Sequence, residues 1–73
     1  MSPALADLPL RTVVRALEKA GFVHVRTKGS HAVYRNADRV VVIPQHGTIK
    51  RGTLASILRQ AGLTPAEFQG LLS

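Results

Sequence analysis

Three short segments rich in β-branched residues lie in the middle of the chain, separated only by short polar connections. They cover residues 22–27, 31–35 and 39–43. Alternating, β-branched segments bounded by Gly, Asn, Asp and Ser are typical of β-strands. Because parallel neighbours need a crossover of a dozen residues or more, the three-residue connections here require antiparallel pairing. The sequence therefore predicts a three-stranded antiparallel meander.

Amphipathic helical patterns flank this predicted sheet on both sides. Before it, apolar residues recur at helical spacing over residues 10–20, and Pro9 suits the start of that helix. After it, a second apolar stripe covers residues 54–61. Residues 64–67 form a capping-box signature that starts a third, short helix. The predicted order is α-β-β-β-α-α.

The two longer helices must pack on one face of the sheet, because neither can bury its apolar stripe alone. This predicts an α+β fold of the double-stranded-RNA-binding-domain kind, with helices on one face of a three-stranded antiparallel sheet. The pattern leaves one question open. Val40 and Val42 compete with Val41 and Ile43 for the core-facing side of the third strand.

A chain of 73 residues has room for one hydrophobic core. We therefore expect residues 1–73 to form a single domain, with residues 1–8 as a flexible arm because they show no periodic pattern. No segment resembles a signal peptide or a membrane span, so the expected location is the cytoplasm. The absence of cysteine excludes disulfides and thiolate zinc sites.

The chain is strongly basic for its size. Ten Lys and Arg residues stand against four Asp and Glu residues, which gives a formal net charge of +6. This balance favours a polyanionic partner, with nucleic acid first and a membrane surface second. The alternatives are an acidic protein partner or a basic surface that is only solvated. We expect RNA and an acidic protein as partners, and no membrane.

Three histidines, His24, His31 and His46, are the candidates for acid–base chemistry. Their spacing does not match a metal site, and carboxylates near them are scarce. A Ser-His-acid triad is excluded because Ser30 adjoins His31 in the sequence, so their side chains diverge. There is no glycine-rich phosphate loop. We therefore expect neither a metal nor a cofactor.

His31 follows a tight turn at Gly29 and Ser30 and begins the second predicted strand, with Arg26 and Lys28 close by. Cleavage of RNA by its own 2′-OH needs a base, an acid and cations that stabilise the phosphorane. Histidine suits the proton transfers because its ordinary pKa lies near neutrality. The alternative is that His31 is an ordinary surface histidine.

Lys50 and Arg51 precede the second long helix and suggest a phosphate contact at its N-terminus. The alternative is that this segment only starts the helix and that both side chains are solvated. His46 lies in the loop before it and is a candidate to support the site, whereas His24 is expected to be a plain strand side chain.

Four ordered blocks of the sequence resemble the HicA toxin family. They are Leu17-Glu18-Lys19-Ala20-Gly21-Phe22, Lys28-Gly29-Ser30-His31, Pro44-Gln45-His46, and Gly52-Thr53-Leu54 followed by Ile57-Leu58 and Ala61-Gly62-Leu63. The resemblance covers nearly all of residues 13–68. The resemblance implies a double-stranded-RNA-binding-like fold and an mRNA endonuclease, or mRNA interferase. It also implies a type II toxin–antitoxin system in which a HicB antitoxin covers the active site.

The same resemblance assigns a role to one histidine. The family's catalytic histidine falls on His31, and Gly29 and Ser30 correspond to the turn that positions it. His46 also matches a family position, but no role carries over to it. The competing hypothesis is a non-catalytic module that binds double-stranded RNA without cutting it.

Overall fold

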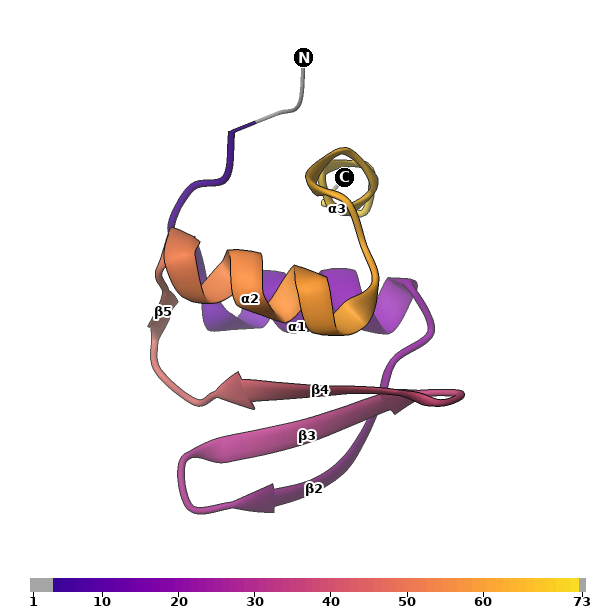
Figure 1. The fold of residues 1–73 in the computed structure, drawn as a ribbon. Helices are drawn as coiled ribbons and strands as arrows, with labels where there is room; N and C mark the ends of the chain where they lie inside the picture. The colour runs from indigo at the N-terminus through magenta and orange to yellow at the C-terminus, as the bar shows by residue number, and fades with distance from the viewer. Residues whose placement is uncertain (1–3, 73) are drawn as a thin grey trace.

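The computed structural model describes residues 4–72 and contains three helices and five strands in that part of the chain (Figure 1). The elements are β1 (Leu8–Pro9), α1 (Leu10–Lys19), β2 (Val23–Lys28), β3 (His31–Asn36), β4 (Arg39–Pro44), β5 (Thr48–Ile49), α2 (Arg51–Ala61) and α3 (Pro65–Gly70). The predicted α-β-β-β-α-α order is confirmed. The short strands β1 and β5 are additions that the sequence pattern did not predict.

Strands β2, β3 and β4 form the predicted antiparallel meander in the order β2-β3-β4. The structure also resolves which side of β4 faces the core. Val41 and Ile43 are fully buried, whereas Val40 and Val42 are 45% and 39% exposed. The reason is the register with β3, because Val41 lies opposite the buried Tyr34.

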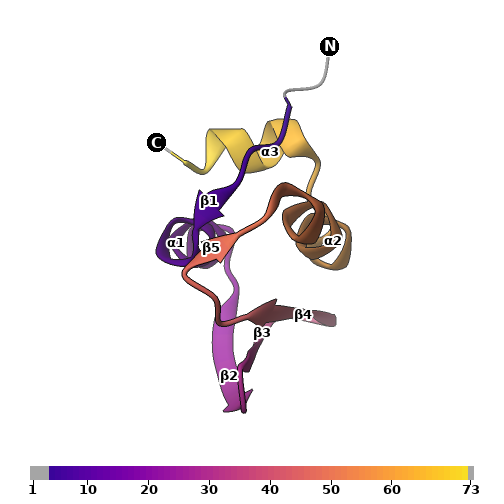
Figure 2. The same cartoon turned by 90° about the vertical axis from the view of Figure 1, so that its left-hand side faces the viewer.

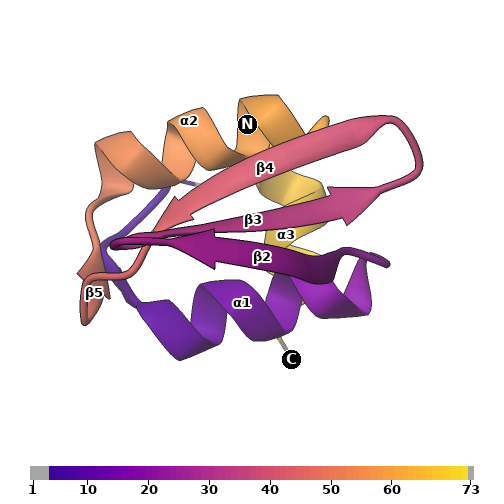
Figure 3. The same ribbon diagram turned by 90° about the horizontal axis from the view of Figure 1, so that it is seen from below.

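Both long helices cover the same face of the sheet, as Figures 2 and 3 show from two further directions. Helix α3 lies on the other side of α1 and α2, so it adds a third layer (Figure 1). Side chains from all three layers meet in one core, which includes Leu17, Leu54, Val41 and Phe68. The fold is therefore α+β and consistent with a double-stranded-RNA-binding-like domain. Within residues 4–72, no helix combines the length and the apolar character that crossing a membrane requires.

The segment before α1 differs from the expected flexible arm. Leu8 and Pro9 pair with Ile49 and Thr48, and the Leu10 amide donates a hydrogen bond of 3.0 Å to the carbonyl oxygen at Gly47. Pro9 is the N-cap of α1 and not its first residue. The sequence did not indicate this pairing of Leu8, because its partner Ile49 lies far along the chain and leaves no local pattern. Residues 1–3 of the predicted arm lie outside the described residues.

Helix α3 begins with the predicted capping box. The Thr64 hydroxyl accepts a hydrogen bond from the Glu67 amide at 3.1 Å, and the Glu67 carboxylate accepts one from the Thr64 amide at 2.8 Å. Both interactions with Thr64 lower the pKa of Glu67, and the hydrogen bond from the Thr64 backbone has the larger effect. The stabilisation from this carboxylate is therefore present at neutral pH and is lost as the pH falls through its lowered pKa.

Replacing Thr64 by alanine should lower the free energy of unfolding by about 1 kcal/mol, because the Glu67 amide loses its acceptor. Urea unfolding followed by circular dichroism measures this change. Thr64→Ser keeps the hydroxyl and should retain most of the stability. Equal losses in the two variants would show that the hydroxyl is not the cause.

Candidate functional site

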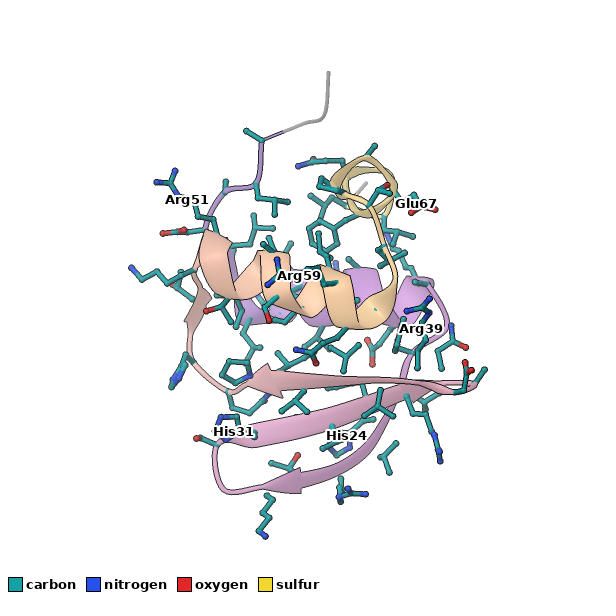
Figure 4. All side chains as sticks on the ribbon, viewed as in Figure 1. His24, His31, Arg39, Arg51, Arg59 and Glu67 are labelled. Carbon is teal, nitrogen blue, oxygen red and sulfur yellow. The ribbon has the colours of Figure 1, made fainter. Side chains whose placement is uncertain are left out.

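The turn between β2 and β3 presents His31 at one end of the sheet. Gly29 has a positive φ of 59°, a conformation that side chains with a Cβ rarely adopt, so glycine suits this position. The turn consists of Gly29 and Ser30, and it places Lys28 directly across from His31. Both of these side chains are exposed. Figure 4 shows His31 beside this turn, at the start of β3.

The end of β4 and the loop after it also contact the turn and His31. His31 pairs with Pro44 in the sheet, and the Gln45 amide donates a hydrogen bond of 2.6 Å to the carbonyl oxygen of Ser30. The Gln45 side chain donates another, of 3.0 Å, to the carbonyl oxygen of Ile43. The His31 backbone is thus fixed by strands on both sides. His46 follows Gln45 directly in the chain, so its backbone lies at the same end of the sheet.

A β-bulge in β2 decides which cations share a face with His31. Tyr34 is buried toward the helices, so by alternation His31 lies on the opposite, outer face of β3. The register shifts between His24 and Arg26, so that Arg26 pairs with Val33 and not with the inward-facing Ala32. Without this extra residue, Arg26 would lie on the helix side. The bulge therefore places Arg26 on the same face as His31.

At the start of α2, where the sequence predicts a phosphate contact, the structure has the carboxylate of Asp7. The Arg51 amide donates a hydrogen bond of 2.8 Å to Asp7 Oδ1, and Lys50 Nζ lies 3.9 Å from Asp7 Oδ2. The backbone amide of Arg51, at the helix N-terminus where the sequence suggested a phosphate contact, therefore already donates its hydrogen bond to the Asp7 carboxylate. Figure 4 shows Arg51 at the helix layer, apart from the sheet end with His31. Sequence reasoning missed Asp7, because 44 positions separate it from Arg51.

His24 lies on the helix side of the sheet, away from His31. It pairs with Tyr34, and the two rings make an edge contact with centroids 5.3 Å apart. Its Nε2 is 2.7 Å from the Thr27 hydroxyl. Burial, and then the nearby Glu18 carboxylate, raise the pKa of Tyr34. His24 thus lies in strand β2, as expected, and contacts other side chains of the sheet.

At the start of β3, the exposed imidazole of His31 stands on a backbone that is fixed at both sides, and Lys28 and Arg26 lie beside it on the outer face. In the described part of the chain, no side chain forms a hydrogen bond or ion pair with His31, and no group of three metal-binding residues forms. An exposed imidazole with exposed cations beside it can exchange protons with a bound anionic ligand.

The sequence also matches a known family. The family model described as the HicA toxin of bacterial toxin–antitoxin systems matches residues 10–63, from the start of α1 to just after α2. The matched region includes the turn at Gly29 and Ser30 and the whole β2-β3-β4 sheet. No curated protein sequence matches the chain. Because the match covers well over half of the 73 residues, the chain belongs to the HicA toxin family of bacterial toxin–antitoxin systems.

Proposed function

We propose that this chain is an RNA endonuclease that cleaves mRNA in the cytoplasm, and that His31 transfers the protons of the reaction. Membership of a toxin family supports the proposal. The observation that carries it is the outer-face group of His31, Lys28 and Arg26, in which the cross-strand pairing and the β-bulge bring an exposed imidazole and two cations together. The net charge of +6 suits a polyanionic substrate.

The proposed reaction is attack by a ribose 2′-OH on the adjacent phosphorus. The 2′-oxygen forms a bond to phosphorus as the bond to the 5′-oxygen breaks, which leaves a 2′,3′-cyclic phosphate and a 5′-OH. One proton leaves the 2′-OH and one is delivered to the 5′-oxygen, and His31 is the exposed group suited to such transfers. Lys28 and Arg26 would stabilise the negative charge that develops on the phosphorane.

Incubation of end-labelled RNA with the purified protein in EDTA tests this reaction. We expect cleavage to continue without divalent metal and the fragments to end in 2′,3′-cyclic phosphate. The alternative function, favoured by the double-stranded-RNA-binding-like fold, is a module that binds RNA through shape and phosphates. RNA that is bound but stays intact would support that alternative. The salt dependence of binding would not separate the two, because both use phosphate contacts.

We also propose that a HicB-type antitoxin neutralises the chain by covering His31. An inhibitor of a basic, RNA-cleaving surface should itself be acidic, and we expect a small acidic protein to be encoded beside this gene. Expression of the chain alone should arrest bacterial growth, and co-expression of the adjacent gene should restore it. Arrest that the adjacent gene does not relieve would contradict the partner assignment.

A further inference from the structure

The outer face of the β2-β3-β4 sheet exposes several large aliphatic side chains. The large apolar side chains exposed within residues 4–72 are Val23 at 65%, Val25 at 48%, Val40 at 45% and Val42 at 39%. All four lie on these strands, on the face opposite the helices. Figure 3 views the molecule from the side of this face, with the strands between α1 and α2 in the picture and no helix drawn over the sheet. Contiguous exposed apolar surface of this kind marks an interaction site.

Positive charge surrounds these valines. Val25, Val33 and Val40 line a shallow pocket of about 150 Å³ together with Arg26 and Arg35. The Asp and Glu residues of the sequence all lie outside the three strands. The face therefore combines an aliphatic centre with cations and no carboxylate of its own. We call it the valine face, defined by Val23, Val25, Val33, Val40 and Val42 with Arg26 and Arg35.

We propose that the valine face is the docking surface for the antitoxin, a protein that presents apolar side chains ringed by carboxylates. This inference rests on the proposed toxin–antitoxin pairing. RNA fits the valines themselves less well than it fits the cations beside His31, because valine offers bases no π-surface for stacking and phosphates leave aliphatic groups hydrated. A second copy of this chain also fits poorly, because it would bring Arg26 and Arg35 against the same cations.

The strand edges of the sheet suit a partner less than its face. Along β2, the bulge at Val25 in the β2–β3 pairing bends the edge strand, and Arg26 and Lys28 add charge. At the β4 edge, the Val42 amide already donates a hydrogen bond of 2.9 Å to Gln60 Oε1 from α2. We therefore place the partner on the valine face and do not expect it to extend the sheet by a strand.

The valine face is continuous with the candidate active site. Arg26 and Val33 form one cross-strand pair, and Lys28 and His31 form the outer-face pair nearer the turn. A protein anchored on the valines therefore reaches His31 without needing contact with it for affinity. Binding of the antitoxin and RNA cleavage at His31 should therefore depend on different residues. A variant of the valines should still cleave RNA but bind the antitoxin less tightly.

The double variant Val40→Thr/Val42→Thr tests this inference. Threonine keeps the β-branched shape but buries a hydroxyl in the interface, so the Kd for the purified product of the adjacent gene should rise about tenfold or more. Cleavage of RNA by the free variant should equal that of the wild type. Arg35→Glu should weaken the complex as well. Arg59→Glu is the matched control, because it makes the same charge change on an exposed residue of α2.

Methyl NMR of the wild-type chain gives a second measurement that does not depend on any variant. Addition of the adjacent gene's product should shift the signals of Val23, Val25, Val40 and Val42. If that protein binds but neither the shifts nor the loss of affinity appear, the docking surface is wrong and the toxin–antitoxin pairing stands. If it does not bind the wild type at all, both proposals fail. A folded threonine variant that loses RNA cleavage would identify the face as an RNA surface and overturn the inference.

Discussion

Replacing His31 by alanine should slow RNA cleavage by about 10²–10⁴-fold, the usual effect of removing a general acid or base. We expect a large loss because no other histidine of residues 4–72 lies on the outer face of these strands. His46 is exposed near the same end of the sheet, but it lies in the loop after β4. The side chain of His31 is exposed and makes no hydrogen bond to the described residues, so stability should change little. Single-turnover cleavage of labelled RNA in EDTA measures the rate.

His24→Ala is the matched control for this variant. It removes the same side chain from the neighbouring strand but from the helix side of the sheet, where His24 contacts Tyr34 and Thr27. Its cleavage rate should equal that of the wild type once the folded fraction is taken into account. If His31→Ala cleaved RNA as fast as the wild type, His31 would have no role in the chemistry. If the His24 variant were the slower one, the active site would lie on the opposite face.

Much of the fold follows from local sequence patterns. The three-residue connections at residues 28–30 and 36–38 permit only antiparallel pairing, and the apolar stripes of α1 and α2 require a shared sheet face. The orientation of β4 did not follow, because Val40 and Val42 are as apolar as Val41 and Ile43. Only the register with β3 distinguishes the two pairs, and register is a tertiary property.

Only the local features of the candidate site could be predicted from the sequence. The Gly29-Ser30 turn and the position of His31 after it are local features, and the structure has both. The face on which Arg26 lies is not local, because the bulge breaks the two-residue period that sequence reasoning assumes. The carboxylate of Asp7 at the start of α2 is a contact between distant segments. No periodicity or motif near Asp7 indicates its partner.

Replacing Phe68 by alanine should have the largest effect on stability, a loss of about 3–5 kcal/mol. Phe68 is fully buried and is the buried residue of α3, so its ring connects this six-residue helix to the core. A chain of this length is expected to have a total stability of roughly 4–11 kcal/mol. The variant should therefore be largely unfolded at moderate urea concentrations, which circular dichroism measures. Leu71→Ala, at a half-buried position just after the helix, is the control and should cost less.

The Phe68 variant also separates stability from chemistry. The family match ends at residue 63, before α3, and Phe68 lies in the third layer, with α1 and α2 between it and the sheet that carries His31. The folded fraction of Phe68→Ala should therefore cleave RNA at the wild-type rate at low temperature, and the activity should fall with temperature as the protein unfolds. His31→Ala should show the opposite behaviour, with a normal melting curve and little activity at any temperature. An unchanged melting curve for Phe68→Ala would mean that α3 does not stabilise the core.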